Sequence, residues 1–169
     1  MKYDFSDDIQ RGILFLAKYS RDFYLQISSL VKPEYFEYPI HSNIYQAISR
    51  YYEDYKDIPK DLHLLECVKD FKTPKEDLSD YDDELYKVNS MDASCIGHTE
   101  FFMDIIETFA QKSAMRDAIT SSIGLLKDDR MGEIEELVRE ALCINRNVDL
   151  GQAYFSDVMA RFERSLNSD

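Results

Sequence analysis

Glycine and proline are scarce in this chain of 169 residues, which contains five glycines and four prolines. Few tight turns are therefore expected. Twelve tyrosines and ten phenylalanines supply aromatic side chains for a core, and stretches typical of strands are rare. The composition predicts an all-α protein.

Cysteine is also scarce. The chain has three cysteines, Cys67, Cys95 and Cys143, an odd number that excludes a complete disulfide framework. Because no apolar leader begins the sequence, we expect a reduced, cytoplasmic setting. No apolar run approaches the length of about 20 residues that a membrane-spanning helix needs, so no membrane association is expected.

Basic residues are few compared with acidic ones. Twenty Lys and Arg stand against 33 Asp and Glu, which leaves a formal net charge of −13. Long-range electrostatic repulsion opposes the approach of a phosphate backbone. We therefore expect no strong direct DNA binding by this chain.

The segment from Leu30 to Pro59 contains the clearest pattern of helix starts and stops. Pro33 disfavours a helical conformation at Lys32, so a helix ending near Val31 is followed by a turn with two aromatic rings. After Pro39, Ser42 is the candidate N-cap of a helix that ends at Lys56 and Asp57. Apolar residues recur there at helical spacing: Ile44, Tyr45, Ala47, Ile48, Tyr51, Tyr52 and Tyr55.

Further helices are predicted on both sides of this segment. The first is expected from Ser6 or Asp7 to Lys18, and a second follows a break near Ser20. Farther along, the run Thr73-Pro74-Lys75-Glu76 resembles a capping box and predicts a helix start. An acidic helix with the thin apolar stripe Leu78, Tyr81, Leu85, Tyr86 and Val88 is expected to follow on the surface.

The second half of the chain is predicted to form an αα-hairpin. A loop composition at residues 89–97 precedes a helix from Thr99 to about Lys127, a turn, and a second helix containing Ile134 and Leu142. Two helices have a thin interior, so part of their apolar stripe needs another surface. The expected self-association residues are Phe101, Phe102, Ile105, Phe109, Ile119, Ile123, Ile134, Leu137 and Leu142. Which of them are core and which are interface stays open from sequence.

The Leu30 to Pro59 segment resembles the N-terminal domain of DnaB-family replicative DNA helicases, with a closer likeness to those of large tailed phages. The matching residues are Leu30, Pro33, Glu34, Tyr35, Phe36, His41, Ile44, Tyr45, Ala47, Ile48, Tyr51, Tyr52 and Pro59. The resemblance implies a compact helical head (1–90), a hairpin that pairs with a neighbouring subunit (91–146), and a linker helix toward a missing ATPase domain (147–169).

The resemblance also implies a role in DNA replication. Such a domain forms a dimer or the collar of a hexameric ring, and it docks primase and helicase loader. In the family the linker helix docks on the ATPase domain of the adjacent subunit. The residues expected to do so here are Tyr154, Phe155, Val158, Met159 and Phe162.

Motifs for chemistry are missing from the sequence. A P-loop requires the pattern G-x-x-x-x-G-K-[ST], and the five glycines are isolated from any such pattern. We therefore expect no catalytic residues and no cofactor in this chain, with ATP and magnesium bound in the ATPase domain. For the full-length protein, continuing past residue 169, the resemblance implies an ATP-dependent helicase.

Two pairs of possible zinc ligands have a spacing that fits one helical turn, His63 with Cys67 and Cys95 with His98. The alternative is that the cysteines are small buried residues and the histidines are surface or capping groups, and on balance no metal site is predicted. His41 is expected to be a turn or core histidine. Acidic pairs such as Asp82-Asp83 and Asp128-Asp129 are expected to be solvated.

Three alternative functions stay open. One is the helicase-binding C-terminal domain of a primase, which resembles the same arrangement of head and hairpin. Another is a free-standing acidic phage protein that inhibits a host enzyme by imitating the charge of DNA. An enzyme with a zinc or magnesium centre is the remaining alternative.

Overall fold

The computed structural model describes residues 5–144 and Arg164, and within these residues the chain is helical and has no strand. This confirms the predicted all-α fold. The chain divides into two compact units, Met1–Ile105 and Ile106–Asp169, and the boundary falls inside one long helix. The predicted division at residues 90 and 146 stays a prediction, and the linker segment 147–169 lies outside the described residues apart from Arg164.

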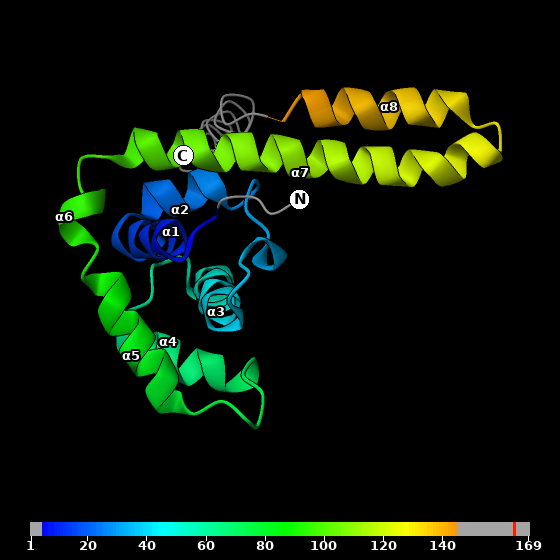
Figure 1. Cartoon of the computed structure of the whole chain (residues 1–169). Helices are drawn as coiled ribbons and strands as arrows, with labels where there is room; N and C mark the ends of the chain where they lie inside the picture. Colours follow the sequence, from blue (N-terminus) through cyan, green and yellow to red (C-terminus); the bar gives the residue numbers. More distant parts are fainter. Residues whose placement is uncertain (1–4, 145–163, 165–169) are drawn as a thin grey trace. The chain divides into compact units, whose positions relative to one another are not determined.

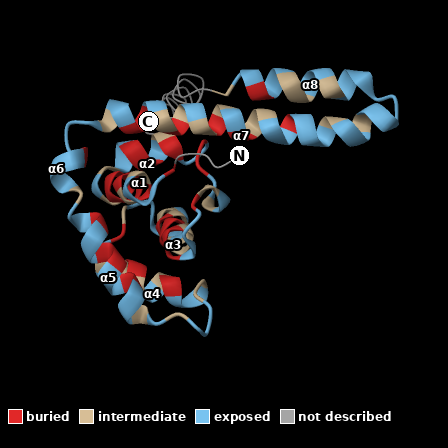
Figure 2. Cartoon of the chain, viewed as in Figure 1, coloured by how far each residue is buried: buried red, intermediate tan, exposed pale blue. Residues whose placement is uncertain are grey.

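The first unit is a head built around helix α1 (Figure 1). It contains α1 (Asp7–Tyr19), α2 (Arg21–Ile27), α3 (Pro39–Tyr55), α4 (Asp61–Cys67), α5 (Leu78–Asn89), α6 (Asp92–Cys95) and the 3-10 turns η1 (Pro33–Tyr35) and η2 (Val68–Asp70). Helix α1 packs against α2, α3, α5 and α6. The five residues from Ile13 to Ala17 are all buried, as Figure 2 shows for this helix. A helix buried on most sides is the centre of a core.

Local capping explains where α1 and α2 begin. The Ser6 hydroxyl accepts a hydrogen bond from the Ile9 amide, and the Ser20 hydroxyl accepts one from the Phe23 amide. Serine is a favoured N-cap because its oxygen satisfies an amide that has no partner within the helix. The predicted start of α1 and the break at Ser20 are both confirmed.

Three predicted boundaries are wrong. Helix α2 ends at Ile27, not near Val31, because the Ile27 carbonyl accepts the amides of both Leu30 and Val31 in a closing turn. Helix α3 begins at Pro39 and not after Ser42, since the ring of proline already has the φ angle of a first helical residue. The end of α3 is as predicted, with Lys56 in the left-handed conformation.

The third error concerns the capping box at Thr73. Helix α5 begins at Leu78, not at Pro74. The Glu76 carboxylate does accept the Thr73 amide, as a capping box requires, but it also accepts the Tyr81 hydroxyl at 2.7 Å. Lys72 donates to the Glu76 carbonyl. These contacts hold Glu76 in a turn, and Asp77 caps the helix instead.

The predicted αα-hairpin is confirmed. Helix α7 (Thr99–Lys127) is followed by a turn with Asp129 in the left-handed conformation and by α8 (Met131–Leu142). Helix α8 runs back beside α7 in Figure 1. The Gln111 amide donates to the Ile144 carbonyl at 2.8 Å, which ties the open end of the hairpin.

Gly12 on α1 leaves no room for a side chain. A Cβ atom at this position would lie 2.3 Å from the Phe102 ring and 3.3 Å from the Cys95 sulfur. We expect Gly12→Ala to lower the free energy of unfolding by about 1–3 kcal/mol, because the ring has to move. Urea denaturation measures this loss. Gly124→Ala in α7 is the control, since nothing lies within 4 Å of its Cβ position. An equal effect at both positions would contradict the close contact.

Candidate functional site

Large apolar side chains are exposed along the hairpin. Ile119, Ile123 and Leu126 on α7, with Met131 and Leu142 on α8, are between 57% and 69% exposed. We call these five residues the hairpin face. Single exposed apolar residues are ordinary on a protein surface, whereas a contiguous group indicates an interaction surface.

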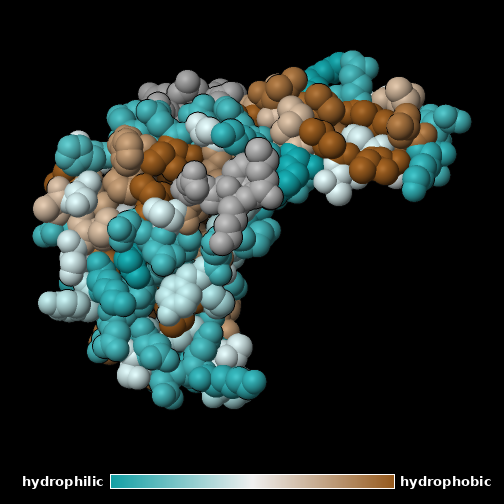
Figure 3. All heavy atoms as spheres, in the orientation of Figure 1, coloured by the Kyte–Doolittle hydropathy of each residue, from teal (hydrophilic) through white to brown (hydrophobic). Residues whose placement is uncertain are grey.

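The spacing of these residues places them in one stripe on each helix. Positions 119, 123 and 126 follow the i, i+4, i+7 rule, and positions 131 and 142 are separated by about three helical turns. Figure 3 shows apolar side chains gathered over both helices of the hairpin on the side that it presents. Both helices of the hairpin therefore contribute exposed apolar side chains.

The interior of the hairpin is too small to hide this surface. Among the described residues of the second unit, those that are buried are Ile106, Ala110, Ser113, Ala118 and Ala141. Apart from Ile106 they have small side chains. Met115, Leu125 and Val138 are half-buried. The hairpin therefore has more apolar surface than its own packing covers.

The predicted self-association residues fall into three groups. Ile119, Ile123 and Leu142 lie on the hairpin face, and Phe101 is 58% exposed at the start of α7 in the first unit. Phe102 is buried in the head. The half-buried residues are Ile105, Phe109, Ile134 and Leu137.

Leu126 and Met131 belong to the hairpin face but were not among the predicted self-association residues. The signal for Leu126 is the helical spacing from Ile119 and Ile123 continued to the end of α7. The residues expected to dock the linker helix, from Tyr154 to Phe162, lie outside the described residues.

No known protein family, no curated protein and no solved structure matches this chain.

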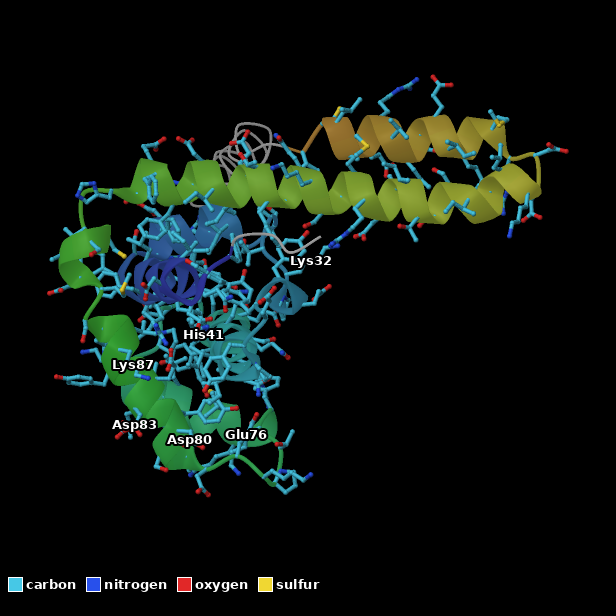
Figure 4. All side chains as sticks on the ribbon, in the orientation of Figure 1. Lys32, His41, Glu76, Asp80, Asp83 and Lys87 are labelled. Atoms are coloured by element: carbon cyan, nitrogen blue, oxygen red, sulfur yellow. The ribbon has the colours of Figure 1, made fainter. Side chains whose placement is uncertain are left out.

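A second notable arrangement is a buried polar network in the head, formed by Gln10 and Arg11 of α1, His41 of α3 and Glu84 of α5. The Glu84 Oε1 atom lies 2.6 Å from both Arg11 Nε and His41 Nε2. His41 Nδ1 lies 2.8 Å from Gln10 Oε1. Figure 4 labels His41 and, on α5, Asp83 and Lys87. The network joins three helices through charged hydrogen bonds.

Glu84 is almost fully buried, at 3% exposed. Burial raises the pKa of its carboxyl group, but the hydrogen bonds from Arg11 and His41 outweigh burial and the pKa is lowered. Glu84 is therefore ionised at neutral pH. The expectation that His41 is a core histidine is confirmed, since its side chain has no exposed surface.

Acid should destabilise the head through Glu84. Because its folded-state pKa is lowered, its contribution is complete above the ordinary carboxyl value of about 4.3 and is lost as pH falls through the folded value. We expect the urea midpoint of the native chain to fall more steeply below about pH 5 than that of Glu84→Gln. Asp83→Asn, on the exposed side of α5, is the control. Equal slopes for the native chain and Glu84→Gln would contradict this assignment.

Two of the four possible zinc ligands, His63 and Cys95, make other contacts in the head. His63 Nδ1 accepts the Lys60 amide at the start of α4, and its ring stacks on Tyr51 at 5.0 Å. The Cys95 thiol lies 3.8 Å from the Gly12 carbonyl, and burial raises its pKa to about 11. Cys67 is half-buried and His98 is exposed. Within the described part of the chain, no three His, Cys, Asp or Glu side chains are grouped to hold a metal ion.

The acidic pairs also show no such grouping. Asp82 and Asp83 are exposed on α5, and Asp128 and Asp129 are exposed in the hairpin turn. None of the helices in residues 5–144 has the length and apolarity required to cross a membrane.

Proposed function

We propose that this chain is the N-terminal oligomerisation and partner-docking domain of a DnaB-type replicative DNA helicase. The observation that supports it most is the hairpin face, an apolar surface on a helical hairpin that follows a helical head. The resemblance of the Leu30 to Pro59 segment to that family supports the same role.

In this proposal the hairpin face pairs with the same face of a second copy. Burying a large aliphatic side chain stabilises by about 1.5–3 kcal/mol. The five residues of each chain are 57–69% exposed, so ten in a symmetric pair offer roughly 9–18 kcal/mol, which is comparable to a cost of association of the order of 4–15 kcal/mol. A symmetric pair uses the same surface on both copies.

The proposed domain binds proteins and performs no reaction. ATP hydrolysis belongs to the ATPase domain of the helicase, and the assembled heads offer surfaces to primase and loader. The net charge of −13 opposes direct binding of DNA to this domain.

Light scattering during gel filtration tests the assembly. At tens of micromolar we expect a mass of at least two chains, each of 19.9 kDa. A mass of one chain would overturn the assembly and favour the acidic inhibitor, which should then compete with DNA for a nuclease in a salt-sensitive manner.

Binding to the primase and loader of the same replication system tests the helicase role separately. We expect at least one of them to bind the assembled chain in titration calorimetry. Assembly without binding to either protein would leave the hairpin contact intact and refute the helicase role.

A further inference from the structure

Both ring nitrogens of His41 face oxygen atoms. Nδ1 lies 2.8 Å from Gln10 Oε1, and Nε2 lies 2.6 Å from Glu84 Oε1. A neutral imidazole has one N–H donor and one lone pair, so it can satisfy only one of two acceptors. The ring has no exposed surface, and solvent therefore cannot separate the remaining nitrogen from the oxygen that it faces.

The orientation of the Gln10 amide is set by a third group. Gln10 Nε2 donates to the Phe5 carbonyl at 2.6 Å, and this contact is buried. Turning the amide over would give His41 a donor, but it would place Gln10 Oε1 against the Phe5 oxygen. Two acceptors would then meet in a buried position, which costs free energy comparable to a lost hydrogen bond. The oxygen of Gln10 is therefore the atom that faces His41.

Glu84 cannot supply the missing proton. Its Oε1 atom accepts from Arg11 at 2.6 Å, and its Oε2 atom lies 3.7 Å from Lys87 Nζ. Two cations beside this carboxylate keep it ionised. The other titratable groups around the ring are Asp7 of α1 and Tyr38, whose ring meets the His41 ring edge-on at 4.9 Å.

We infer that His41 is a buried proton-binding site that holds an imidazolium ion at neutral pH, with one N–H donated to α1 and the other to α5. The proton converts a repulsive contact into a hydrogen bond. It thereby joins α1, α3 and α5 at one point. The inference is independent of the proposed function.

Burial lowers the pKa of His41, the hydrogen bond and charge of Glu84 raise it, and the charge of Arg11 lowers it. These influences together lower the pKa. The inference depends on the second acceptor, Gln10 Oε1, which faces Nδ1 at 2.8 Å and favours the protonated ring. When the folded-state pKa of His41 lies above the ordinary histidine value of about 6.5, the protonated ring stabilises the fold below that pH. The stabilisation is then lost as pH rises through the folded-state value.

The ¹⁵N spectrum of the imidazole nitrogens in the full chain at pH 7.5 tests the inference directly. The signals of His41 are identified by their loss in His41→Gln. We expect both nitrogens of His41 to show the shift of a protonated nitrogen. One protonated and one bare nitrogen would overturn the inference.

Removing the second acceptor gives an independent test. In Gln10→Leu a neutral ring still donates Nε2–H to Glu84 and no acceptor faces Nδ1, so we expect one bare nitrogen at the same pH. The control Gln46→Leu, on the same helix as His41, should keep two protonated nitrogens. A Gln10→Leu ring that stays doubly protonated would show that Gln10 does not hold the proton in place.

Discussion

Replacing Ile119 and Ile123 together by aspartate is expected to convert the assembled chain to a monomer. Both side chains are more than half exposed on α7, so the fold does not depend on their burial. In the pair, however, four carboxylates would be buried without partners, which costs several kcal/mol. We expect association at least about 100-fold weaker in sedimentation velocity, with unchanged helix content by circular dichroism.

The matched control is Thr120→Asp with Ser121→Asp. These two residues are exposed on the same turn of α7 but lie off the hairpin face. The control adds the same charge to each chain, so it should keep the native mass. Equal dissociation of both double variants would show that charge repulsion causes the effect. An undiminished dimer in the variant with Ile119→Asp and Ile123→Asp would refute the hairpin face as an interface.

Replacing Glu84 by alanine should cause the largest loss of stability in the head. Arg11 and His41 would both lose the oxygen that they contact at 2.6 Å. Removing one partner of a buried charged pair costs about 3–5 kcal/mol, because the other charge remains buried without compensation. Urea denaturation at pH 7 measures the loss.

Asp83→Ala is the control for this variant. Asp83 is the preceding residue of the same helix and is exposed, so we expect a change within about 0.5 kcal/mol. A loss below about 1 kcal/mol for Glu84→Ala would show that the network does not hold the three helices together.

The hairpin could be predicted closely from sequence because its signals are local. Helical spacing of apolar residues extends over the whole of α7, and the turn of charged residues at its end separates it from α8. The wrong start of α3 overlooks a local rule, since proline suits the first helical position, whereas the start of α5 depends on contacts made in the folded chain. Glu76, for example, is held in a turn by Tyr81, and no local pattern shows which partner Glu76 takes.

The buried network is harder to predict for the same reason. Glu84 stands in an acidic run that indicates a solvated helix. Counted from Tyr81, however, Glu84 lies at i+3, beside Leu85 at i+4 and Val88 at i+7, on the buried face of α5. This helical position in the sequence indicates that the Glu84 side chain is buried. Its partners Arg11 and His41 come from other helices, so the pairing itself requires the tertiary structure.

Which residues of the hairpin stripe are buried and which are exposed also depends on tertiary contacts. Periodicity places Phe102 and Ile123 in the same apolar pattern, but Phe102 is buried against Gly12 and Ile123 is 58% exposed. Only the packing of neighbouring helices distinguishes the two.

The central claim is that the hairpin face is covered by a second copy of the chain. An isotope-filtered NOE spectrum of mixed methyl-labelled and unlabelled chains tests this contact most directly. We expect intermolecular NOEs at the methyl groups of Ile119, Ile123 and Leu126. An assembled chain whose intermolecular NOEs arise elsewhere, with none at these three residues, would contradict the account.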